Sequence, residues 1–195
     1  MSNTMTREGR TGRPSPIPLP LLGAAAAGAA VAIGAGVYGS VHDPTGQQTI
    51  SLFFSSTLAF KSWVTTLVLG LALFQLFTAL RVFGRIGIPK EMPEWLGEAH
   101  RLSGTIILIS TLPVVYHCLW SLGFEPDVTD VRRFTHSVLG CVFYGAFVTK
   151  IVAVRNHSLP RWFLPTVGGI VFTVLVGIWM TSSLWYFTTV EFPGF

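Results

Sequence analysis

The sequence is poor in charged residues, which make up only 11% of its 195 residues, whereas about a quarter of a soluble domain is charged. Half of the residues are hydrophobic, and they gather in long uncharged runs. This balance excludes an ordinary soluble domain. It predicts an all-α, polytopic helix bundle whose first partner is a lipid bilayer, and we expect a multi-pass protein of the cell (plasma) membrane.

Cysteine is also scarce. Cys118 and Cys141 are the only two, and both lie inside apolar runs, so a disulfide framework is excluded. We expect both thiols to be reduced and to act as small packing residues. Because histidines lie close to them along the chain, a copper or zinc site that combines imidazole and thiolate is the alternative.

Familiar catalytic signatures are absent. The sequence has no P-loop or other phosphate-binding glycine loop, no His-Glu-x-x-His and no nucleophile triad pattern. The formal net charge is +4, but the basic residues stand between apolar runs. Their positions therefore describe membrane topology, and no nucleic-acid partner is expected.

Five apolar runs are long enough to cross a bilayer. Residues 1–20 are polar and then proline-rich, and we expect a disordered cytoplasmic tail. Residues 21–190 form the predicted transmembrane domain, and residues 191–195 a short external tail. A signal peptide cleaved near Ser40 is the competing interpretation of the first run. The predicted spans are 21–41, 62–80, 102–124, 134–154 and 162–190.

The basic residues are distributed unevenly between the two ends of these runs. Cytoplasmic loops of membrane proteins are enriched in Lys and Arg, so an N-in, C-out orientation is predicted. The inner side then holds Arg7, Arg10, Arg13, Arg81, Arg85, Lys90, Arg101, Lys150, Arg155 and Arg161, and the outer side holds Lys61, Arg132 and Arg133.

Two histidines fall at matching depth in consecutive runs. His117 lies about six residues before the outer end of the third run, and His136 about three residues after the outer start of the fourth. At ~1.5 Å per residue, both lie roughly 5 to 10 Å below the outer surface. Imidazoles on neighbouring antiparallel helices can ligate a metal from both sides, and Gly140 leaves room for a flat macrocycle. We predict His117 and His136 as axial ligands of one haem b. Another metal and two purely structural histidines are the alternatives.

Arg132 and Arg133 lie one turn before His136 at the outer surface. Arginine binds carboxylates through paired donors, so both are predicted to contact the haem propionates. The alternative is that acidic residues of the same loop neutralise them, and that loop contains Glu125, Asp127 and Asp130.

His100 lies at the inner end of the third run, about 25 Å along the helix axis from His117. A second haem there would need another ligand, and the only other inner histidine is His157 in a loop. We therefore predict one haem and keep His100 as the next ligand to test. Its alternative role is a hydrogen bond to loop backbone.

The segment His100-Arg101-x-x-Gly104, followed by His117 and then His136, resembles the haem-bearing core of cytochrome b561-like and ferric-reductase-like membrane proteins. Those families place two histidines on each of two helices, whereas the fourth run has only His136. The whole chain also resembles an uncharacterised group of small actinobacterial five-helix membrane proteins, through residues 113–120, 136–141 and 159–162.

Two functions are expected from these features. The first is a b-type cytochrome-like protein, such as an oxidoreductase component, that passes electrons to or from a quinone or a partner protein. The second is a non-redox protein, either an accessory subunit of a membrane complex or a small metal carrier.

Overall fold

The computed structural model describes residues 18–47, 50–156, 158–190 and 192, and this part of the chain contains helices and loops but no strand. Two of its long helices end in π-helical turns, named η1 and η2. In chain order the elements are α1 (Leu19–Val41), α2 (Thr57–Val82), α3 (Leu96–Tyr116), η1 (His117–Leu122), α4 (Val131–Val154), α5 (Phe163–Trp179), η2 (Met180–Leu184) and α6 (Trp185–Thr189).

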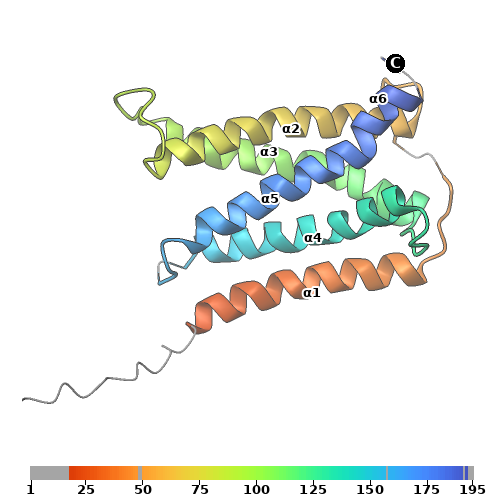
Figure 1. Ribbon diagram of the computed structural model, residues 1–195, viewed down its shortest axis with the longest axis horizontal. Helices are drawn as coiled ribbons and strands as arrows, with labels where there is room; N and C mark the ends of the chain where they lie inside the picture. Colours follow the sequence, from red (N-terminus) through yellow and green to blue (C-terminus); the bar gives the residue numbers. More distant parts are fainter. Residues whose placement is uncertain (1–17, 48–49, 157, 191, 193–195) are drawn as a thin grey trace, which may run out of the picture.

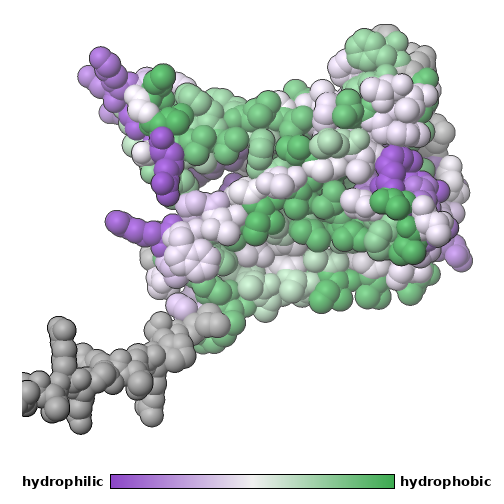
Figure 2. Space-filling view, viewed as in Figure 1, coloured by the Kyte–Doolittle hydropathy of each residue, from purple (hydrophilic) through white to green (hydrophobic). Residues whose placement is uncertain are grey.

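The predicted all-α class and the five spans are confirmed. Each of five helical segments is long and apolar enough to cross a membrane, with lengths from 23 to 27 residues. Figure 2 shows the expected surface, with polar side chains at the two ends of the bundle and apolar side chains between them. The tail predicted for residues 1–20 lies almost wholly outside the described residues, as do 191 and 193–195 of the external tail.

The lateral order of the helices differs from their order in the chain (Figure 1). Helix α1 forms one edge and packs on α4, α4 packs on α5, and α5 packs on α2, which in turn packs on α3. Helices α3 and α4 are consecutive, but their described backbones do not pack closely. The Tyr144 hydroxyl of α4 bridges them by donating to the carbonyl of Thr111 in α3, at 2.9 Å. Helices α3 and α4 are therefore neighbours through their side chains, and their backbones stand apart.

The core lies where α2, α3, α4 and α5 meet. Aromatic side chains of α4 fill the space that the separated backbones leave, and aliphatic side chains of the other three helices surround them. This cluster consists of Val68, Ala72, Ile107, Phe143, Phe147, Val171 and Leu175.

Helix α2 begins at Thr57, five residues before the predicted start of the second span. Ser56 caps it, because its hydroxyl accepts a hydrogen bond from the backbone N–H of Ala59 at 3.1 Å. Lys61 was predicted to mark the outer boundary of this span. It instead lies within the helix, with only 7% of its surface exposed.

Both π-helical turns lie toward the same end of the bundle (Figure 1), the end that the basic residues predict to be outside and that is called the outer end below. Pro113 lies four residues before η1. Because proline has no backbone N–H, one hydrogen bond of the α-helix is missing there. The loop after α1 donates two hydrogen bonds to carbonyl groups of η1. The N–H of Thr45 donates to the carbonyl of Trp120 at 3.1 Å, and the N–H of Gly46 donates to that of Ser121 at 3.0 Å. Such turns occur frequently at functional sites.

Candidate functional site

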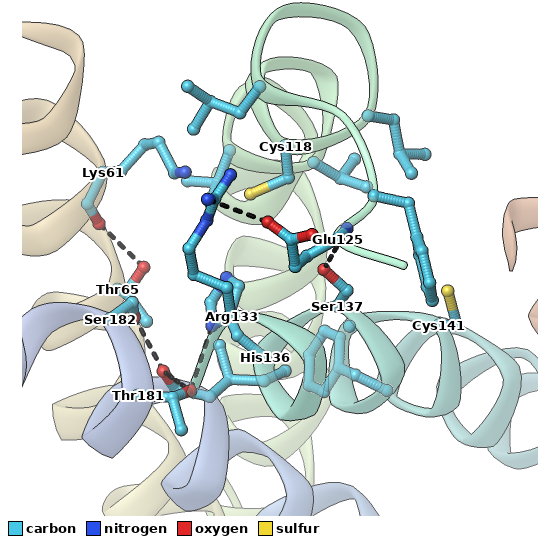
Figure 3. Close-up of a pocket in the computed structure, with 18 of the residues that line it drawn as sticks. Lys61, Thr65, Cys118, Glu125, Arg133, His136, Ser137, Cys141, Thr181 and Ser182 are labelled. Atoms are coloured by element: carbon cyan, nitrogen blue, oxygen red, sulfur yellow. Dashed lines mark hydrogen bonds and ion pairs between the residues drawn. The ribbon is translucent and has the colours of Figure 1, made fainter. Parts of the chain in front are cut away.

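A cavity of about 320 Å³ lies between the helices at the outer end of the bundle. All five helical segments contribute to its lining, and both π-helical turns do so, through Cys118 of η1 and Thr181 and Ser182 of η2. Most of the wall is apolar, and Phe143 and Leu175 form part of it. Figure 3 shows the polar side chains that point into it.

Four of the six predicted site residues line this cavity, namely His136, Gly140, Arg132 and Arg133. A Cβ atom added to Gly140 would meet no atom within 4 Å, so the glycine faces open space. The structure therefore brings these four residues together at one site.

His117 does not line the cavity. Its ring is fully buried, with Nε2 3.0 Å from the carbonyl oxygen of Ile50 and Nδ1 3.3 Å from the hydroxyl of Ser121. A carbonyl only accepts, so Nε2 carries the proton and Nδ1 accepts from Ser121. The imidazoles of His117 and His136 face different surroundings. A haem held by both would require His117 to give up these bonds.

His100 also lies away from the cavity. Its Nδ1 is 2.7 Å from the hydroxyl of Thr78 in α2, and its carbonyl oxygen accepts from the amide of Gln75, which also donates to Ser103 at 2.7 Å. His100 thus bonds a neighbouring helix and not loop backbone. Its suggested partner His157 lies outside the described residues.

The ring of His136 is oriented by Thr181 of η2, whose hydroxyl oxygen lies 3.0 Å from Nδ1. That hydroxyl donates its own proton to the carbonyl of Gly177, at 2.8 Å. A hydroxyl has one proton to donate, so Thr181 accepts from His136 and Nδ1 carries the ring proton. The lone pair of the neutral imidazole is then on Nε2.

Cys118, His136 and Lys61 are three polar residues of the cavity lining (Figure 3). The three residues come from η1, α4 and α2, and all three line the cavity. Lys61 has no ion pair with any carboxylate in the part of the chain that the structure describes. The site therefore holds a thiol, an imidazole and a buried ammonium group in one cavity.

The two arginines differ in their partners. Arg133 pairs with Glu125 at 2.8 Å and more weakly with Asp130 at 3.9 Å. Arg132 has no carboxylate partner among the described residues; its guanidinium lies 3.9 Å from the centre of the Trp185 ring and donates to the carbonyl of Thr181 at 2.9 Å. The alternative of neutralisation by acidic loop residues therefore applies to Arg133 and not to Arg132.

Asp127, the third acidic residue of that loop, binds neither arginine. Its carboxylate accepts from the backbone N–H of Thr129 at 2.8 Å, and this bond holds the pKa of Asp127 below its ordinary value. Asp127 thus stabilises the turn and does not neutralise either arginine of the cavity.

Comparison with known proteins assigns the chain to a family. The model of the family of unknown function DUF6529 matches residues 21–194. The chain belongs to this family. Neither the search of curated proteins nor the search of solved structures found a match. Because DUF6529 has no assigned function, the match supports neither the resemblance to cytochrome b561-like and ferric-reductase-like proteins nor the actinobacterial grouping.

Sequence analysis of this DUF6529 chain missed two residues of the site, Lys61 and Thr181. Lys61 was read as a flank of the second span, although Ser56 just before the apolar residues is a helix-start signal that would have placed it inside. Thr181 carries no sequence signal, because a threonine in an apolar helix usually bonds its own backbone.

A metal centre in this DUF6529 chain would rest on few ligands. No group of three or more His, Cys, Asp and Glu that could hold a metal ion occurs in the described ranges.

Proposed function

We propose that this protein binds a molecule with an anionic head and an apolar body in the outer cavity, and that the molecule enters from the surrounding membrane. One observation carries the proposal: two cations that line an otherwise apolar cavity, Lys61 and Arg132, have no carboxylate partner among the described residues. An anionic head would supply the missing charge, and the apolar walls fit a hydrocarbon body.

Lys61 gives the stronger support for an anionic ligand. A buried ammonium group costs free energy unless a counter-charge or hydrogen bonds compensate it. Lysine can avoid this cost near a membrane surface by extending its amine to water, but here only 7% of the residue is exposed. An ionisable residue held inside a membrane segment in this way indicates a functional site.

Arg132 is held in place for a ligand. The Trp185 ring stacks against its guanidinium, and the Thr181 carbonyl accepts one of its N–H groups. The remaining N–H groups are free to bind a carboxylate or phosphate through paired donors. A cation fixed before binding loses little conformational entropy when the anion arrives.

Haem b is one member of this ligand class, since it has two propionates on an apolar macrocycle, and a specific observation favours it. His136, Gly140, Arg132 and Arg133 line the same cavity. In this arrangement His136 would hold the iron through Nε2 and Arg132 would hold a propionate, whereas Arg133 would first have to leave Glu125. A haem here would support electron transfer to or from a quinone or a partner protein.

Binding is tested with oleate and oleyl alcohol, which share an apolar body but differ in the anionic head. Native mass spectrometry of the detergent-purified protein should show one oleate per chain and about tenfold weaker binding of the alcohol, the loss expected for one charge-assisted bond. Lys61→Met and Arg132→Gln should each weaken oleate binding to a similar degree.

Arg101→Gln is the matched control, because the Arg101 side chain is 74% exposed at the opposite end of the bundle. Equal binding of acid and alcohol, or unchanged binding in both cavity variants, would reject the proposal. Hemin titration followed by absorption spectra before and after dithionite tests the haem candidate. A colourless protein leaves the accessory-subunit alternative.

A further inference from the structure

We propose that the anionic head of the cavity's ligand is a phosphate monoester, so that the protein selects a dianionic lipid over a monoanionic one. This inference rests on the proposed function, because it names the chemical class of the head group at the same site. It follows from the charges that line the cavity and from the hydrogen bonds that already engage its hydroxyl groups.

The charged side chains of the cavity wall do not balance. They are three cations and one carboxylate, namely Lys61, Arg132, Arg133 and Glu125. Glu125 pairs with Arg133 at 2.8 Å, and Figure 3 shows this pair inside the cavity. Asp130 lies 3.9 Å from the same arginine but outside the lining. With a neutral imidazole at His136, the wall has a net charge of +2.

A head group with one negative charge would compensate only half of this excess. The other cation would stay without a counter-charge, which is costly for Lys61 because only 7% of the residue is exposed. A phosphate monoester carries a charge of about −1.5 to −2 at neutral pH and has three acceptor oxygens. It can therefore neutralise Lys61 and Arg132 together.

Most of the hydroxyl groups at the wall cannot add to this recognition. They already donate their only proton to a backbone carbonyl, as is the case for Thr65, Thr111, Tyr144, Thr181 and Ser182. The ammonium and guanidinium groups are then the main donors for an anion. Affinity should consequently follow the charge of the head group more than the number of its oxygen atoms.

A lipid phosphate also leaves the existing ion pair of the cavity in place. The second propionate of a haem would require Arg133 to leave Glu125, whereas a phosphate that binds Lys61 and Arg132 makes no such demand. The rest of the wall is mostly apolar, and Gly140 faces open space that a hydrocarbon chain can enter. A free phosphate ion would leave this apolar space unfilled.

The test compares oleyl phosphate with oleyl sulfate. Both have the chain of oleate and three terminal oxygens, and at about pH 8 they differ by one negative charge. Native mass spectrometry of the full-length protein in detergent should show about tenfold tighter binding of the phosphate, the factor expected for one further charge-assisted bond.

Three substitutions change the net charge of the wall. Lys61→Met and Arg132→Gln each remove one positive charge, and each should make the affinities for the phosphate and the sulfate nearly equal. Glu125→Gln keeps an oxygen for the N–H of Asp127 and frees Arg133, so it should raise the affinity for oleyl phosphate. Arg101→Gln, at the opposite end of the bundle, should leave both affinities unchanged.

Oleate binding separates this inference from the proposed function. Equal binding of oleyl phosphate and oleyl sulfate by a parent protein that still binds oleate overturns the inference and leaves the proposed function standing. Displacement of oleyl phosphate by millimolar inorganic phosphate would assign the site to the free ion and also overturn it. If the parent protein binds none of the three lipids, both proposals fail.

Thermal unfolding of each variant shows whether it is folded. A preference for the phosphate that persists in folded Lys61→Met or Arg132→Gln protein overturns the inference, as does a folded Glu125→Gln variant whose affinity for oleyl phosphate does not rise. Arg132→Gln and Glu125→Gln decide the question even if Lys61→Met does not fold.

Discussion

Gly28 of α1 and Gly145 of α4 face each other so closely that a Cβ atom on Gly28 would lie 2.4 Å from the carbonyl oxygen of Gly145. The same atom would lie 1.9 Å from the Thr149 hydroxyl. Between membrane helices the hydrophobic effect gives little attraction, and close backbone approach through small residues replaces it. This contact fixes α1 against the rest of the bundle.

Gly28→Ala is therefore expected to destabilise the protein by about 1–3 kcal/mol, because the backbones must move apart to admit one methyl group. Gly34→Ala is the matched control on the same helix, since a Cβ atom at Gly34 meets nothing within 4 Å. Thermal unfolding of both variants in one detergent gives the comparison. Equal midpoints would show that α1 does not pack on α4 in this way.

The number of helices could be predicted from the sequence, but their lateral order could not. Span length follows from hydropathy, because the bilayer has a fixed thickness. Which helices touch depends on small-residue contacts that hydropathy does not reveal. Among the glycines of α1, Gly28 meets α4 closely, whereas Gly23 and Gly34 face open space.

The empty space beside Gly140 makes it a position for blocking the cavity. Gly140→Leu should fill part of the cavity and weaken oleate binding at least tenfold while unfolding changes little, because the added atoms enter unoccupied space. Native mass spectrometry and thermal unfolding of the same sample measure both effects. A stable variant that binds oleate as the parent does would place the ligand elsewhere.

The Thr78 hydroxyl and His100 connect α2 and α3 in the inner half of the bundle. Thr78→Val keeps the shape of the side chain, and we expect it to lower stability by about 1 kcal/mol, since hydrogen bonds between membrane helices contribute little more than this. Oleate binding should not change, because neither residue lines the cavity. A loss of bound ligand or of haem colour in this variant would restore His100 as a site residue.

The orientation of the bundle is testable through its loops. Reporter fusions after Glu94, Asp127 and Ser158 should report inside, outside and inside, as the basic residues predict. The cavity then lies in the outer half of the membrane, and its ligand would come from the outer leaflet. The reverse pattern would move the site to the cytoplasmic face.

The site was only partly predictable from the sequence. The depth of a residue along its helix can be predicted, but the rotation of each helix about its own axis, which decides where a side chain points, cannot. His117 and His136 were placed at one depth, but the π-helical turn of η1 and the loop carbonyl of Ile50 determine where His117 points. Cys118, one residue later, enters the cavity in its place.

Substitution of the two histidines should therefore separate stability from binding. His117→Ala removes a fully buried ring and leaves the Ile50 carbonyl without its donor, so we expect a loss of about 1–3 kcal/mol in stability and little change in oleate affinity. His136→Ala removes a ring at the cavity wall and should reduce hemin binding and its absorbance, with a smaller effect on unfolding. If hemin binds the parent protein and each substitution abolishes its spectrum without unfolding the protein, both histidines ligate the iron and the bonds of His117 seen here must break on binding.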